Sequence, residues 1–201
     1  MNFLSIDCST EIGSLFIKTK NKTFIKVLQS DKFISDLLVH HILDFIKEND
    51  LKFEDFNQIY VNQGPGNFSS LRSSLSIAKG ISLSKNLRLF GYDNFIWPCV
   101  KFYNKSDYVF SFTKVREKYY VKKFDKELNT ISEPKIITQE DMITNYNNEF
   151  KVIPKNISYQ FSSEILKLSN LSIVDLNHNE LEFLQFKGLL DDKLIKPLYL
   201  T

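Results

Sequence analysis

The sequence predicts an α/β fold, because short β-branched and aromatic runs alternate with longer segments of helical spacing. Three strands are expected in succession at 3–7, 13–18 and 23–28, and a helix, a strand, a helix, a strand and an apolar segment then follow. Three consecutive strands followed by α-β-α-β-α is the order of the ribonuclease H-like, actin-like half-domain. We therefore expect an actin-like N-terminal βββαβαβα half-domain.

The individual elements of this half follow from local signals. Lys20-Asn-Lys22 separates two β-type runs and suits a hairpin turn. Apolar side chains recur with helical spacing over 34–47, and a second helix is expected over 69–84, with Asn67, Ser69 or Ser70 as its N-cap. The strands that follow these two helices are expected at 58–62 and 88–91.

The pattern weakens after about residue 104. Strands are expected at 107–112 and 118–124, and helices at 138–146, 161–168 and 179–187, with short apolar stretches at 152–153 and 171–174. No internal repeat is evident. We interpret residues 1–104 as the first domain and residues 105–201 as a smaller, reduced second α/β half.

Composition excludes several classes of protein. A formal net charge of +2 does not by itself indicate a nucleic-acid binder. Cys8 and Cys99 show no metal or redox spacing, which favours two buried thiols in a reducing compartment. The N-terminus lacks the basic region of a signal peptide, and no apolar run approaches the ~20 residues that span a membrane. These features predict a cytoplasmic protein without a membrane partner.

The turn after the strand at 58–62 carries Gly64, Pro65 and Gly66. Glycine admits backbone angles closed to other residues and proline fixes φ, so the turn is expected to be sharp and rigid. It also exposes a helix N-terminus where an anion could bind. The turn is neither a P-loop nor a dinucleotide fingerprint, since the spacing fails at Ser69. Both a purely structural role and a phosphate-binding role stay open at this point.

The sequence does not favour nucleotide hydrolysis, metal catalysis or peptidase activity. Nucleotide binding needs glycine-rich turns, yet the first turn is Asp7-Cys-Ser-Thr10 and only Gly188 occurs beyond residue 100, so ATP binding by this chain alone is not expected. Asp7 and Ser9 are expected to stabilise their own turn. The adjacent His40 and His41 cannot both bind one metal ion from a single helix, and no Gly-x-Ser-x-Gly elbow or nearby histidine supports a peptidase.

A basic run alternates with aromatic residues and valine in the second half. It is interpreted as a solvated strand face, with contact to an RNA backbone as the alternative. Its members are Lys114, Arg116, Lys118, Lys122, Lys123 and Lys126.

Two motifs resemble a known family. Asp7-Cys-Ser-Thr-Glu11 resembles the Asp-Thr-Ser-Thr-Glu opening of the TsaB (YeaZ) family, and Gly64-Pro-Gly-Asn-Phe-Ser-Ser-Leu-Arg72 resembles its Gly-Pro-Gly-Ser-Phe-Thr-Gly-Leu-Arg. The likeness covers roughly residues 2–95. The family's helix glycines are replaced here by Ser70 and Ser74.

The resemblance implies a non-catalytic dimerisation subunit of the bacterial tRNA threonylcarbamoyladenosine (t6A) synthase. It would bind and activate a TsaD-like catalytic paralogue, work with a TsaE-like ATPase, meet tRNA only through the complex, and need no cofactor or metal. A homodimer is the alternative assembly, and a stand-alone degenerate hydrolase (glycoprotease-like peptidase) or actin-like ATPase is the alternative function.

The partner surface is expected on the helices at 34–47 and 69–84. The apolar residues of the first helix cover more than one stripe, and one stripe suffices to cover a sheet, so the rest can face a partner. Small residues on the second helix would allow close approach. The expected interface residues are Leu38, His41, Ile42, Phe45, Ser70, Ser73, Ser74 and Ile77.

Overall fold

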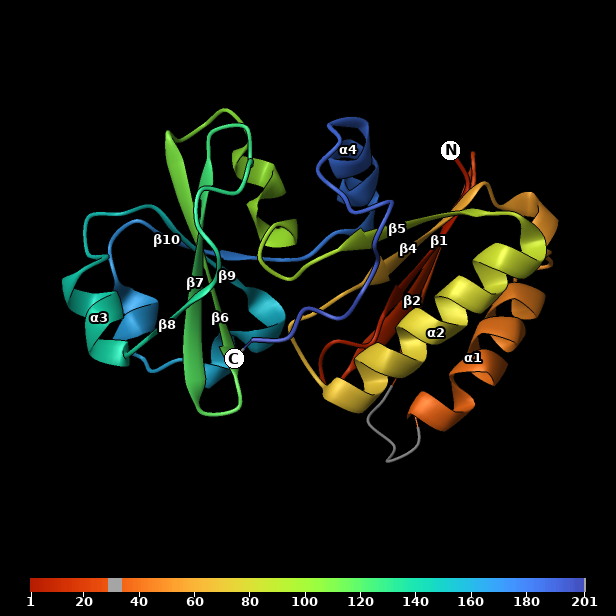
Figure 1. Cartoon of the computed structure of the whole chain (residues 1–201), viewed down its shortest axis with the longest axis horizontal. Coiled ribbons are helices and arrows are strands. Elements are labelled where there is room, and N and C mark those ends of the chain that lie inside the picture. The colour runs from red at the N-terminus through yellow and green to blue at the C-terminus, as the bar shows by residue number, and fades with distance from the viewer. Residues whose placement is uncertain (29–33, 201) are drawn as a thin grey trace. The chain divides into compact units, whose positions relative to one another are not determined.

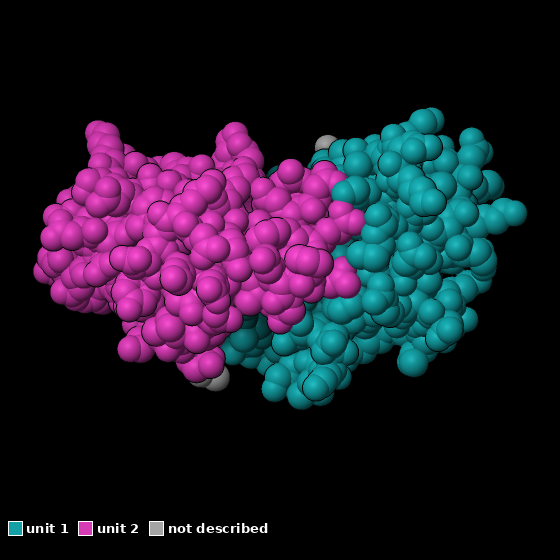
Figure 2. Space-filling model, turned by 90° about the horizontal axis from the view of Figure 1, so that it is seen from above, with its two compact units in different colours: residues 1–93, 190–199, 201 teal, residues 94–189, 200 magenta. Residues whose placement is uncertain are grey.

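The computed structural model describes residues 1–28 and 34–200 (Figure 1). They form two compact units, coloured separately in Figure 2. The first unit consists of Met1–Asp93 and Leu190–Tyr199, and the second of Asn94–Leu189 and Leu200. The division precedes Asn94 instead of lying near residue 104, because Trp97–Phe102 forms a 3₁₀ helix whose Phe102 ring packs against Phe150 of the second unit, with centroids 4.7 Å apart.

The first unit contains a mixed five-stranded sheet in the order β3-β2-β1-β4-β5. β1 pairs antiparallel with β2 and parallel with β4, so the hairpin strands continue into a parallel half of the sheet. The strands are β1 (Phe3–Asp7), β2 (Gly13–Lys18), β3 (Thr23–Leu28), β4 (Gln58–Asn62) and β5 (Arg88–Tyr92). All five expected strands are present, β5 one residue longer than expected.

Two helices, α1 (Ile34–Glu48) and α2 (Phe68–Lys85), lie side by side on one face of this sheet (Figure 1). Their apolar residues join those of β1, β2 and β4 in one core, which Ile195 of the C-terminal segment completes. Asn67 caps α2, because its side-chain oxygen accepts the Ser70 N–H at 3.2 Å. A 3₁₀ turn, Phe53–Asp55, precedes β4.

The second unit holds another five-stranded sheet in the order β10-β9-β6-β7-β8. Its strands are β6 (Tyr108–Val115), β7 (Lys118–Asp125), β8 (Lys135–Ile137), β9 (Lys151–Pro154) and β10 (Leu171–Val174). Its helices are short: α3 (Gln139–Thr144), α4 (Leu181–Phe186), and the 3₁₀ turns Lys155–Gln160, Ile165–Lys167 and His178–Glu180. A separate core gathers around Phe112, Ile153 and Ile165.

The two units repeat one topology although the sequence shows no repeat. In both, the first strand pairs antiparallel with the second and parallel with the fourth. The chain is therefore an actin-like α/β fold with a reduced second half, as expected.

One helix expected in the second half is absent. Residues 161–168 form only a single 3₁₀ turn over Ile165–Lys167, instead of the expected helix. The hydroxyl of Ser162 accepts the Ile165 N–H at 3.4 Å, a bond typical of the residue that precedes a helical turn.

Candidate functional site

The turn after β1 and the turn after β4 are bonded to each other. Asp7 Oδ1 accepts the Ser9 N–H at 2.9 Å, the Ser9 hydroxyl at 2.7 Å and the Asn62 side-chain amide at 3.0 Å. Asn62 Oδ1 in turn accepts the Gly64 N–H at 2.8 Å. Asp7, Ser9 and Asn62 are all buried, so this network links the two turns from within.

The glycines of the second turn serve different needs. Gly64 has φ +98°, in the left-handed region, and precedes a cis peptide bond to Pro65. Gly66 instead lies against the first turn, because a Cβ built on it would meet the Ser9 carbonyl oxygen at 1.9 Å. The expectation that unusual backbone angles require glycine therefore holds at Gly64, while Gly66 is required for space.

The electrostatics of this network suit a structural role. Burial raises the pKa of the Asp7 carboxyl, and the hydrogen bonds from Ser9 and Asn62 act in the opposite direction. At the start of α2, the Asn67 N–H donates to the Ser9 carbonyl at 2.8 Å and the Asn67 side chain caps Ser70. Two N–H groups at this helix start, those of Asn67 and Ser70, are thus bonded within the protein itself.

The C-terminal segment closes over the same turn. Leu198 N–H donates to the Gln63 carbonyl at 2.7 Å, and the Gln63 side-chain amide donates to the Lys196 carbonyl at 2.9 Å. At the start of α2, Arg72 stacks on Phe68 at 3.9 Å from the ring centroid and donates to the Tyr199 hydroxyl at 2.8 Å. These contacts hold Lys196, Leu198 and Tyr199 against the turn and the start of α2.

The structure divides the apolar residues of α1 into two sets. Leu38, Ile42 and Phe45 are 0%, 1% and 3% exposed, so they belong to the core, and their expected place in a partner surface is corrected. They point at the sheet because they recur on one helical face. Leu37, Val39 and Leu43 are instead 44–48% exposed.

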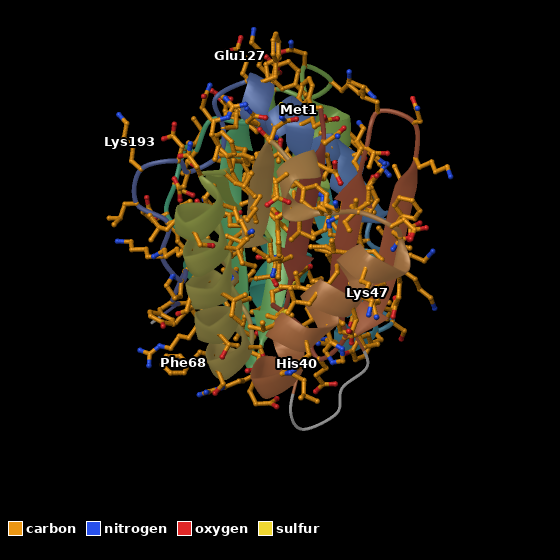
Figure 3. The ribbon with its side chains drawn as sticks, turned by 90° about the vertical axis from the view of Figure 1, so that its right-hand side faces the viewer. Met1, His40, Lys47, Phe68, Glu127 and Lys193 are labelled. Atoms are coloured by element: carbon orange, nitrogen blue, oxygen red, sulfur yellow. The ribbon has the colours of Figure 1, made fainter. Side chains whose placement is uncertain are left out.

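The flanks of α1 can be assigned from its neighbours. Glu48 pairs with Lys26 of β3 at 3.0 Å. The half-buried His41, two turns before Glu48, therefore faces the β3 side of the helix. Val39 and Leu43, one turn apart, lie on the outer face. Figure 3 views the helix pair with His40 and Lys47 marking α1 and Phe68 marking the start of α2.

The interface residues expected on α2 also divide into buried and partly exposed ones. Ser74 is fully buried, with its hydroxyl bonded to the Leu71 carbonyl at 3.1 Å, so its expected contact with a partner is likewise corrected. Ser70, Ser73 and Ile77 are half-buried. Ser76, Gly80 and Leu83 follow each other at helical spacing on the exposed side, where Leu83 is 84% exposed. The sequence analysis did not identify Leu83, because a single leucine near the end of a helix does not show which way its side chain points.

The basic run of the second unit divides into two halves. The ammonium groups of Lys114, Lys122 and Lys123 lie over Tyr119, Phe124 and Tyr108, at 5.0, 5.1 and 3.7 Å from the ring centroids. Arg116, Lys118 and Lys126 are exposed. Three members of the run thus pack on aromatic rings, and the other three are solvated.

Within residues 1–28 and 34–200, no cluster of three histidine, cysteine or acidic side chains has the arrangement of a metal site. No helix in the same ranges is long and apolar enough to cross a membrane.

Comparison with known structures identifies the class. The fold resembles two Pseudomonas aeruginosa structures, YeaZ (TM-score 0.71, 99% of each chain) and an uncharacterized protein described as similar to peptidase YeaZ (TM-score 0.72, 100% and 99%), each 14% identical. The filament protein AlfA from a Bacillus subtilis plasmid also matches, with TM-score 0.54 and 8% identity over 89% and 94% of the chains. The chain thus has a two-unit, actin-like α/β fold.

Sequence comparison identifies the family. A family model described as TsaD, tRNA N6-adenosine threonylcarbamoyltransferase, matches residues 31–97. Two Buchnera aphidicola proteins named tRNA threonylcarbamoyladenosine biosynthesis protein TsaB match at 31% identity over 84 residues and 25% over 154 residues. The matches cover 42% and 69% of this chain and 38% and 66% of those proteins, less than two thirds of either. These matches identify the TsaB (YeaZ) family as the one that this chain resembles in sequence and in fold.

Proposed function

We propose that this protein is a non-catalytic, cytoplasmic subunit of t6A biosynthesis that binds a TsaD-like catalytic paralogue through the outer face of α1 and α2. The observation that carries this proposal is the exposed apolar set on that face. Val39 and Leu43 of α1 are 44% and 48% exposed, and Leu83 of α2 is 84% exposed. Exposed apolar side chains on two paired helices favour association with another protein.

The partner follows from the shared fold. The TsaD model matches the stretch that contains α1, β4, α2 and β5, which is the part of this unit that presents the helices. A paralogue with the same helix pair can offer an equivalent surface, so that two helices from each protein pack together around a pseudo-two-fold axis. The small Ser76 and Gly80 beside Leu83 leave room for such approach.

In this proposal the subunit has a structural role in the complex and no catalytic one. The side chains of Asp7 and Ser9 take part in the hydrogen bonds that join the two turns, which supports a structural role for both residues. Catalysis would then belong to the paralogue, ATP hydrolysis to a TsaE-like subunit, and contact with tRNA to the assembled complex.

The test places a charge on the helix face. Leu43→Glu and Leu83→Glu are each expected to keep the far-UV spectrum, since both side chains are largely exposed. Each is expected to raise the Kd for the TsaD-like paralogue at least tenfold, because the new carboxylate would be buried in the interface without a partner. Isothermal titration calorimetry with the purified paralogue measures the affinity.

The matched control is Ile136→Glu on β8, where the native side chain is 50% exposed. It is expected to leave the affinity unchanged. Wild-type binding by both helix variants would place the contact elsewhere. Ile42→Glu and Ser74→Glu are unsuitable, because both native side chains are buried and a charge there would unfold the monomer.

A further inference from the structure

β3 is an edge strand without the usual protection against pairing. It ends the order β3-β2-β1-β4-β5, and within residues 1–28 and 34–200 its six residues pair with β2 on one side only. Ile25 and Val27 are 63% and 57% exposed. A strand of this length with free backbone groups and exposed β-branched side chains is a template for another strand.

Two other edges, those formed by β5 and β8, differ from β3. The far edge of the same sheet, β5, is covered at Gly91, whose N–H donates to the Asp191 carbonyl at 2.7 Å. β8 occupies the position of β3 in the second unit, yet it is three residues long and follows Pro134. Short length and a flanking proline protect β8, whereas β3 carries neither device.

Lys26 does not protect the edge either. Its ammonium group lies 3.0 Å from both carboxylate oxygens of Glu48, so it is neutralised on the face that α1 covers. The opposite face of the strand presents Thr23, Ile25 and Val27, which contain no charge.

We propose that β3 pairs antiparallel with β3 of a second copy of this chain, around a two-fold axis at Ile25. In this register Ile25 lies opposite Ile25 of the second copy, and Val27 lies opposite Thr23. Lys26 lies opposite Phe24, which avoids two lysines directly facing each other. Identical antiparallel strands are self-complementary, so a closed dimer forms that buries both isoleucines. This surface is separate from the helix face of the proposed function and does not depend on it.

Charge favours a second copy as the occupant. The hairpin end of β3 carries Lys20 and Lys22, while the other end pairs with Gly13, two residues after the exposed Glu11. The antiparallel register sets Lys22 of one copy opposite Leu28 of the other, beside that acidic end. The basic end of β3 in each copy therefore lies beside the acidic end of β3 in the other copy.

Sedimentation velocity on the isolated chain tests the proposal. The wild type is expected to show a monomer–dimer equilibrium as its concentration is raised to about 1 mM. Ile25→Lys is expected to raise the dimer Kd at least tenfold, while Leu83→Lys on α2 leaves it unchanged. A wild type that stays monomeric overturns the proposal, and so does a dimer that Leu83→Lys disrupts and Ile25→Lys does not.

Cross-linking tests the register even if Ile25→Lys fails to fold. Facing residues of antiparallel strands have Cα atoms about 4.5–5.5 Å apart, within the range that a disulfide bridges. Oxidised Ile25→Cys is therefore expected to form a covalent dimer. Val27→Cys is the matched control and is expected to stay monomeric, because its copies would lie four residues, or about 13 Å, apart. The native Cys8 and Cys99 are buried and are present in both variants, so any cross-linking by them is the same in the two samples. Equal cross-linking by both variants, or by neither, overturns the register.

Discussion

At the scale of single residues, two glycines of the first unit carry opposite constraints. Gly66 lies against the backbone of Ser9, where a Cβ would meet the carbonyl oxygen at 1.9 Å. Gly80 lies in α2 with no atom within 4 Å of the same position. One glycine is therefore needed for packing, and the other only weakens its helix.

Alanine substitution separates these roles. Gly66→Ala is expected to lower the free energy of unfolding by about 2–3 kcal/mol, since the two turns must move apart. Gly80→Ala, the matched control, is expected to raise it by about 0.5–1 kcal/mol through helix propensity. Urea unfolding followed by circular dichroism measures both. Wild-type stability of Gly66→Ala would show that the turns do not need this contact.

At the scale of elements, Lys151 connects α3 to β9. It is the first residue of β9 and is fully buried, and its ammonium group donates to the carbonyls of Tyr146, Asn147 and Glu149 at 2.7, 2.9 and 2.7 Å. A lysine that the sequence would place on the surface thus fixes the loop after a short helix.

Lys151→Met is expected to destabilise the protein by about 3 kcal/mol, because three carbonyls lose a charged donor inside the protein. Lys155→Met provides the control: its ammonium group pairs with Asp175 at 3.0 Å on the surface, and its loss is expected to cost at most about 1 kcal/mol. Chemical denaturation measures the two variants side by side. Equal losses would mean that the buried donor contributes no more than a surface pair.

At the scale of the whole molecule, two buried groups give stability opposite dependences on pH. In the first unit, burial raises the pKa of Asp7, so its contribution declines as pH rises above the ordinary aspartate range. In the second unit, burial lowers the pKa of His178 to about 3, where its ring packs on Trp97 at 4.9 Å between centroids. The unfolded chain protonates His178 near pH 6.5, so stability is lost as pH falls below that value.

Acid should therefore weaken the second unit. Between pH 7.5 and pH 5, His178 is expected to remove about 2 kcal/mol of stability, which His178→Phe abolishes. His40→Phe is the control, since His40 is exposed on α1. Thermal unfolding at both pH values provides the comparison. An identical pH dependence in wild type and His178→Phe would contradict a neutral buried ring.

Much of the first unit was readable from local pattern. The strands at 3–7, 13–18, 23–28 and 58–62 form as expected, because alternation and flanking turn residues are local signals that the tertiary structure keeps. The second unit was harder. Its helices are one or two turns long and give no sustained period, so its repeat of the first topology became visible only through strand pairing.

The amino-acid pattern alone established the element order, the sharp turn at Gly64–Gly66 and the surplus of apolar residues on α1. It could not tell which apolar stripe covers the sheet, because both have helical spacing. Packing decided that Leu38, Ile42 and Phe45 enter the core while Val39 and Leu43 stay exposed. Packing likewise decided that Gly66 is needed for space, since a close approach between turns 55 residues apart (Asp7 and Asn62) leaves no local trace in the chain.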